Sequence, residues 1–141
     1  MLRDEIVARC DAIEGCYEFM LAYAGQGLGG LEGSKSSGQV RDYLNRASEA
    51  LPGLSEAYAA VVQEEKLQPL DRYRAFLSVL DADARNALAA IQLVLAQACL
   101  SSQLIDNLNA SIHLRALLTD LFLIDEILKP ENMLAKPATT D

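Results

Sequence analysis

The chain contains a glycine pattern that is able to seat a pyrophosphate. Residues 25–30 read Gly-Gln-Gly-Leu-Gly-Gly, which fits the G-x-G-x-x-G spacing of dinucleotide-binding proteins. That pattern works when a strand leads into the turn and a helix N-terminus then faces the phosphates. Here a helical pattern precedes the glycines and a Ser/Gly-rich stretch follows them. Ser34-Lys35-Ser36 also lacks the glycine that precedes the lysine of a phosphate-binding P-loop. We therefore interpret this stretch as a loop, and no cofactor is predicted.

Thiol and imidazole groups have no metal-ligand spacing. Cys10 and Cys16 are six residues apart, which on a helix places them about 120° apart in direction and about 9 Å apart along the axis. The count of three cysteines, with Cys99, makes a disulfide framework improbable. The residue three before the single histidine, His113, is Ala110, so the Glu-x-x-His motif of di-metal bundles is absent. We predict that the cysteines are small buried hydrophobes and that no residue binds a metal.

His113 is also a candidate phosphoacceptor. Histidine phosphotransfer domains are small helical bundles that carry the pattern His-x-Leu-Lys-Gly, whereas this chain reads His-Leu-Arg-Ala-Leu from 113 to 117. The basic residue arrives one place early, and Leu117 stands in the place of the glycine, where its bulk is expected to crowd a receiver domain. Phosphotransfer through His113, or the binding of a small ligand there, remains an alternative to a histidine on the flank of a helix.

Neighbouring acids are the remaining candidates for chemistry. Glu64-Glu65 and Asp125-Glu126 fall at helix ends or on polar faces, where solvated charge is a sufficient interpretation. No local Ser/His/Asp or Cys/His arrangement is visible. The sequence therefore predicts no catalytic or cofactor-binding residue and no enzyme.

Charge and hydropathy exclude several partners. Twelve basic residues against twenty acidic ones give a net charge of -8, which repels nucleic acid and anionic membranes because the basic residues are scattered. The longest apolar run, residues 19–24, is far shorter than the roughly 18 residues of a membrane span. The N-terminus resembles neither a signal nor a transit peptide. We expect an acidic cytoplasmic protein that binds no nucleic acid and no membrane.

Apolar residues recur at helical spacing through most of the chain. Steps of four and three predict one helix that ends at Gly25 and a second from Val40 to Val61, kinked at Pro52-Gly53. Residues 25–38 hold six glycines and three serines and predict a flexible loop. The first spacing places Ile6, Cys10, Ile13, Tyr17, Met20 and Ala24 in the core, and the second Val40, Leu44, Ala47, Leu51, Leu54, Tyr58 and Val61.

The second half of the chain predicts three more helices. A short one lies near residues 70–80, and Asp81-Ala-Asp83 is typical of the start of a long helix that runs to Ile105. A last helix ends at Lys129-Pro130. Its start is open, since a turn at 101–102 or at 107–111 fits the change of phase. Its expected core residues are Leu114, Leu117, Leu121, Ile124 and Leu128.

Together these patterns predict an all-α antiparallel four-helix bundle. Residues 1–129 form its single domain, and residues 130–141 form a loose tail without periodicity. Aromatic residues make up only 6% of the chain, so the core must be aliphatic, which suits helices better than sheets.

The absence of catalytic motifs favours a non-catalytic interaction or assembly module, such as an adaptor, a small chaperone or an accessory subunit. A further alternative is an accessory chain of an enzyme whose site another subunit completes. The last helix carries more apolar residues than one core stripe requires, and we expect Leu118, Phe122 and Leu123 to point away from the core. They predict a homo-oligomer, most simply a dimer, formed through this helix, with a further protein partner possible.

Overall fold

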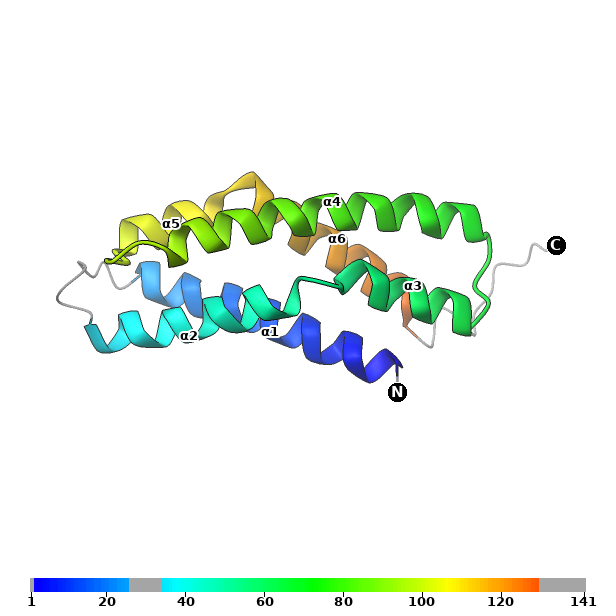
Figure 1. The fold of residues 1–141 in the computed structure, drawn as a ribbon, viewed down its shortest axis with the longest axis horizontal. Helices are drawn as coiled ribbons and strands as arrows, with labels where there is room; N and C mark the ends of the chain where they lie inside the picture. The colour runs from blue at the N-terminus through cyan, green and yellow to red at the C-terminus, as the bar shows by residue number, and fades with distance from the viewer. Residues whose placement is uncertain (1, 26–33, 130–141) are drawn as a thin grey trace.

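The computed structural model describes residues 2–25 and 34–129, which form six helices and contain no strand. The all-α prediction is therefore confirmed. In Figure 1, α2 and α3 follow one another along one side, α5 leads into α6 on another, and α1 and α4 are the two long helices. The helices are α1 (Leu2–Gly25), α2 (Ser34–Ala50), α3 (Leu54–Glu64), α4 (Leu70–Leu95), α5 (Ser102–Ala110) and α6 (Ile112–Leu128).

The predicted loop over 25–38 is wrong in its last part, because α2 begins at Ser34. Val40 is buried in α2, and the helix extends nearly two turns before this residue. Serine, lysine and glutamine are compatible with a helix, and only Gly38 disfavours it, by about 1 kcal/mol. Residues 26–33 of this loop and the predicted tail 130–141 lie outside the described residues.

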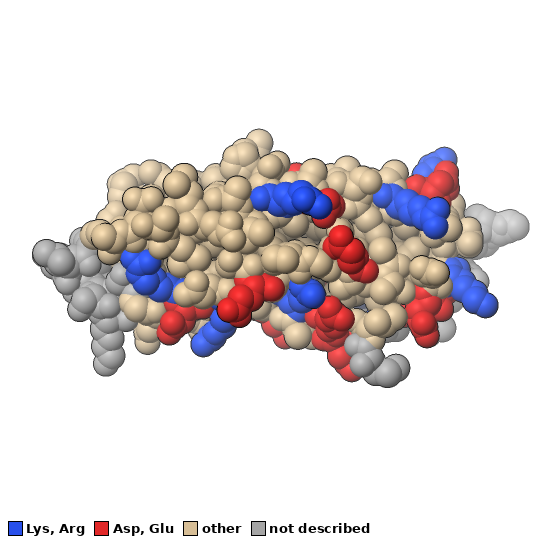
Figure 2. Space-filling model, viewed as in Figure 1, with Lys and Arg blue, Asp and Glu red and all other residues tan. Residues whose placement is uncertain are grey.

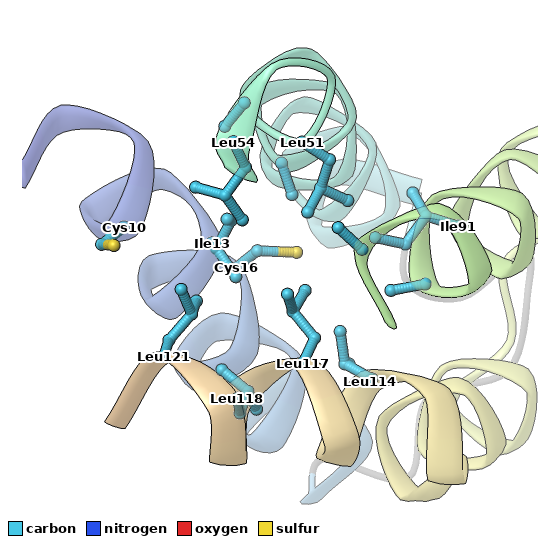
Figure 3. Close-up of a cluster of buried hydrophobic side chains, with 14 of the residues drawn as sticks. Cys10, Ile13, Cys16, Leu51, Leu54, Ile91, Leu114, Leu117, Leu118 and Leu121 are labelled. Carbon is cyan, nitrogen blue, oxygen red and sulfur yellow. The ribbon is translucent and has the colours of Figure 1, made fainter. Parts of the chain in front are cut away.

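The core is one cluster of buried side chains to which all six helices contribute. Every predicted core residue of the second and last spacings is buried. In α1 the prediction drifts by one residue: Ile6, Cys10, Ile13 and Met20 are buried, but Cys16 and Tyr23 replace Tyr17 and Ala24. A strict alternation of four and three averages 3.5 residues per turn, whereas a straight helix has 3.6, so the buried face drifts along a long helix. Figure 3 shows Cys16 among Ile13, Leu51, Leu54 and Leu117.

The predicted kinked helix is instead two helices separated by residues 51–53. Leu51 in this break and Leu54 directly after it are both buried, which keeps the apolar face in phase. Gly53 adopts a left-handed conformation with φ of 81°, which glycine tolerates better than other residues. Arg9 of α1 spans the break, since its Nη1 donates to the carbonyls of Ala50 (2.8 Å) and Pro52 (2.7 Å).

Gly53→Ala should lower the free energy of unfolding by about 1–2 kcal/mol, because a side chain is strained in the left-handed region. The new Cβ would also lie 3.4 Å from Nη2 of Arg9. Gly38→Ala is the matched control: its Cβ meets no heavy atom within 4 Å, and alanine favours the helix by up to about 1 kcal/mol. Urea denaturation of both variants checks the pair, and a loss of stability at position 38 equal to that at position 53 would contradict the conformational explanation.

The predicted short helix near 70–80 and the helix start at Asp81 are wrong, because α4 is continuous from Leu70 to Leu95. Its buried residues Leu77, Leu80, Ala84, Ala87 and Ile91 keep one phase across the predicted boundary. Asp81 does not cap a helix. It accepts a hydrogen bond from Ser55 of α3 (3.0 Å) and pairs with Arg85 one turn later in α4 (2.8 Å).

Helices are interrupted at both positions that the sequence left open for the last turn, 101–102 and 107–111. The helix predicted to reach Ile105 ends at Leu95, and residues 96–101 lead to α5. Ser101 caps α5 by accepting from the backbone N–H of Leu104, and Ser111 caps α6 by accepting from that of Leu114. Serine is among the preferred N-cap residues because its hydroxyl satisfies a free N–H of the first turn.

Three arginines bind the free carbonyls at helix C-termini of other segments. Besides Arg9, Arg41 of α2 donates to the carbonyls of Leu95 (3.0 Å) and Gln97 (2.5 Å) at the end of α4. Arg3 of α1 donates to the carbonyl of Leu128 at the end of α6 (2.8 Å). The last carbonyls of a helix lack partners within it and carry partial negative charge. These side chains therefore fix where three helices end against α1 and α2.

None of the described helices is both long and apolar enough to cross a bilayer. On the face shown in Figure 2, Lys and Arg alternate with Asp and Glu, and the charged side chains leave much of the upper left of that face, over the C-terminal part of α4 and α5, uncovered. From Asn86 to Ile105 the chain has no charged residue.

Candidate functional site

A groove of about 330 Å³ lies between α1 and the C-terminal end of α6. Its walls mix apolar and acidic side chains: Ile6, Val7 and Cys10 of α1 and Leu128 of α6 are joined by Asp11, Glu14 and Asp125. Val7 is 56% exposed at the surface of the groove, whereas Leu128 is buried. A small concave site with apolar walls and a few polar groups is the usual form of a binding site.

A buried hydroxyl anchors one wall of this groove. Tyr58 of α3 is fully buried, and its hydroxyl donates to Oδ1 of Asp125 at 2.5 Å. The Sγ of Cys10 lies 3.2 Å from the same hydroxyl. Residues of α1, α3 and α6 thus meet in one polar cluster, in which Tyr58 fixes the carboxylate of Asp125. The prediction that Asp125 carries simple solvated charge is wrong, because its partner Tyr58 lies in a different helix and gave no signal in the local sequence.

Two carboxyl groups of the groove, those of Glu14 and Asp125, have a raised pKa. Burial raises the pKa of Asp125, although hydrogen bonds from Tyr58 and Cys10 partly offset that effect. Burial also raises the pKa of Glu14, and the charges of Asp125, Asp11 and Glu18 raise it further. A carboxylate is disfavoured where water is partly excluded and other carboxylates lie nearby. When they are ionised, Asp11 and Asp125 therefore repel the carboxylate of Glu14 in the same groove.

The two basic residues of the groove are engaged elsewhere. Arg3 forms a two-pronged pair with Glu65 at 2.6 and 2.7 Å, in addition to its bond to Leu128. Lys129 pairs with Glu126 at 3.0 Å. The hydrogen bond from Arg3 lowers the pKa of Glu65. Glu65 is exposed, as predicted, but it is paired with Arg3 and is not simply solvated.

Two of the three cysteines are buried, as predicted, and Cys99 is exposed, which the prediction missed. Burial raises the pKa of Cys10 and of Cys16 to about 12, so both remain thiols at neutral pH. A thiol is a much poorer nucleophile and metal ligand than a thiolate. Within residues 2–25 and 34–129, no three His, Cys, Asp or Glu side chains are grouped closely enough to hold a metal ion.

Two acidic residues, Asp83 of α4 and Asp120 of α6, lie close together between these helices. Asp120 is one of two buried polar residues found in the described ranges, and its Oδ2 lacks a hydrogen-bond partner there. Burial, followed by the hydrogen bond and the charge of Asp83, raises the pKa of Asp120 to about 7. The other buried polar residue is Asn109 of α5, whose Oδ1 likewise has no partner among the described residues.

The outward face of α6 carries exposed apolar side chains. Phe122 is 56% exposed, Leu123 50% and Ile127 40%; these three residues are called the α6 patch below. Leu118, which was expected to point outward with them, is buried in the core. It lies one turn before Leu121 and Phe122, and α6 buries a wider face than the narrow stripe assumed from the sequence.

His113 is exposed in the first turn of α6. Leu117, four residues later, is completely buried, so the expectation that its bulk crowds the surface near His113 is wrong. Among the described residues, none forms a hydrogen bond or an ion pair with the side chain of His113. His113 takes part neither in the polar cluster of Cys10, Tyr58 and Asp125 nor in the pair of Asp83 and Asp120 between α4 and α6.

Comparisons with protein-family models, with curated proteins and with solved structures find no match for this chain.

Tyr58→Phe should lower the free energy of unfolding by about 1.5–3 kcal/mol, because it removes the donor to a partly buried carboxylate. The effect should shrink on acidification, since a protonated Asp125 depends less on that donor. Tyr73→Phe is the control, as Tyr73 lies half-buried and its hydroxyl forms no hydrogen bond within the described part of the chain. Denaturation at pH 7 and pH 4 measures both, and an equal loss at the two values would contradict the charged form of this bond.

Proposed function

We propose that this chain is a non-catalytic interaction module that forms a homodimer through the outward face of α6. The observation that carries the proposal is the α6 patch, in which Phe122 and Leu123 leave half or more of their side chains in water. Burying such a side chain contributes about 1.5–3 kcal/mol. An exposed apolar patch marks an interaction surface, and two-fold pairing covers it on both chains at once.

The patch extends toward α4. Asp83 and Asp120 interact across the two helices, which run in opposite directions in Figure 1. One turn from this pair lie Val79, which is 48% exposed, and Leu123. One turn farther along each helix lie Phe76 of α4 and Ile127 of α6, on the same faces as Val79 and Leu123. A surface formed by two helices offers a flatter and larger area for a second chain than α6 alone.

Three broader features belong to the same proposal. The antiparallel four-helix bundle is retained as an interpretation in which α2 with α3, and α5 with α6, each serve as one interrupted helix. The free thiols, together with the acidic composition, support a cytoplasmic location. Adaptor, small chaperone and accessory subunit all remain compatible roles, including that of an accessory chain whose enzyme partner completes a site.

Phe122→Glu should convert the dimer to a monomer, because it places a charge at the centre of the apolar contact. Leu21→Glu is the control: Leu21 lies on α1 and is 49% exposed, so the substitution adds the same charge to an equally exposed leucine. Sedimentation velocity at micromolar concentration compares the two with the unaltered chain. Dissociation in both variants, or in neither, would argue against the α6 patch.

His113 carries the alternative proposal of histidine phosphotransfer or small-ligand binding, and its exposure supports that alternative. Incubation with phosphoramidate tests it: labelling of the chain that is lost in His113→Gln would favour phosphotransfer over a purely structural module.

A further inference from the structure

The groove between α1 and α6 is lined by both apolar and acidic side chains, so one ligand is able to contact both. Val7 and Leu128 supply apolar surface, and Glu14 and Asp125 supply carboxyl groups. A ligand that fills this space must satisfy both. The groove is separate in composition from the α6 patch, since none of Phe122, Leu123 and Ile127 lines it.

The charge of the groove selects the sign of the ligand. The charges of Asp125 and Asp11 act on the carboxyl group of Glu14, while the basic groups of the same groove are paired with Glu65 and Glu126. A positively charged group placed between Glu14 and Asp125 would relieve their repulsion. It would also favour the ionised form of both, because an opposite charge lowers the pKa of a carboxyl group.

The site is held rigidly enough to select a geometry. Tyr58 is fully buried and fixes Oδ1 of Asp125 from behind, and Arg3 ties the end of α6 to α1 and α3. The carboxylate of Asp125 therefore need not be ordered when a ligand binds, which reduces the entropic cost of association.

We propose that this groove binds a lysine side chain of a protein partner, with the ammonium between Glu14 and Asp125 and the methylene stem on Val7 and Leu128. Lysine fits because its apolar stem packs on apolar surface while its ammonium stays near polar groups. The exposed Val7 offers contact to apolar residues on either side of that lysine, which a free amine lacks. Two surfaces with different chemistry would allow the module to pair with itself and to bind a second protein.

The test uses the full chain and the peptide acetyl-Leu-Lys-Leu-amide, with amide chemical shifts of Val7, Glu14 and Asp125 as the readout. A dissociation constant on the order of 1 mM is expected for so short a peptide. Acetyl-Leu-Met-Leu-amide should bind at least about tenfold more weakly, since it keeps the shape and loses the charge. Pentylammonium should also bind more weakly, because it lacks the flanking leucines.

Asp125→Asn should weaken binding of the lysine peptide about tenfold while keeping the oxygen that accepts from Tyr58. Glu14→Gln provides a second variant if the first disturbs the fold. Asp106→Asn removes the same charge from an exposed position on α5 and should leave binding unchanged. Equal binding of the methionine peptide, equal binding of pentylammonium, or unaltered binding to Glu14→Gln would each overturn the proposal. None of these results depends on whether the chain forms dimers.

Discussion

Asp120→Asn should make the protein more stable at pH 7, by about 1–3 kcal/mol. Each pH unit between the folded and unfolded pKa values of one group is worth about 1.4 kcal/mol. Burial and Asp83 raise the pKa of Asp120 from 3.8 to about 7. Asparagine removes this unfavourable ionisation, and its amide is able to donate to Asp83.

The pH dependence of stability follows from the direction of that shift. Between about pH 4 and pH 7 the folded chain holds a proton on Asp120 that the unfolded chain has released. The contribution of this group is therefore complete below pH 4, falls as the pH rises through that window, and is constant above it. Asp120→Asn should flatten this fall.

Asp106→Asn is the control for this measurement, because Asp106 is exposed on α5 and the substitution changes the net charge equally. Urea denaturation from pH 4 to pH 8 gives the free energy of unfolding of both variants. A fall of stability in Asp120→Asn as steep as in the unaltered chain would contradict the assignment to the pair of Asp83 and Asp120.

Leu117→Ala should lower the free energy of unfolding by about 2–5 kcal/mol, since it leaves a cavity in a closely packed core. Leu117 is completely buried, and Figure 3 places it beside Cys16 and Leu121, with the side chains of Leu51 and Leu54 facing it. Leu93→Ala is the control, because Leu93 is 67% exposed and should change stability by about 0.5 kcal/mol or less. Urea denaturation compares them, and similar losses at the two positions would contradict this description of the core.

The periodicity of apolar residues predicted the helical class and most of the core. It was successful at Val40, Leu54 and Leu117 because each lies on a face that one helix presents continuously to its neighbours. It failed at Asp81, where the acidic residues are typical of a helix start. They lie instead inside the continuous α4, where Asp81 accepts a hydrogen bond from Ser55 of α3.

Contacts between distant residues could not be predicted in this way. Arg9 binds carbonyls more than forty residues away, and Tyr58 joins Asp125 across sixty-seven residues. Such pairs depend on how helices are placed beside one another, which local periodicity does not specify. The burial of Asp120 was missed for the same reason, because its partner Asp83 lies in a different helix, α4.

The mass of the unaltered chain in solution tests the proposed interaction module most directly. Light scattering after size exclusion at micromolar concentration should give twice the chain mass of 15.3 kDa, because the α6 patch is then covered by a second copy. A mass equal to that of one chain across this concentration range would contradict the dimer and leave Phe122 and Leu123 exposed to water.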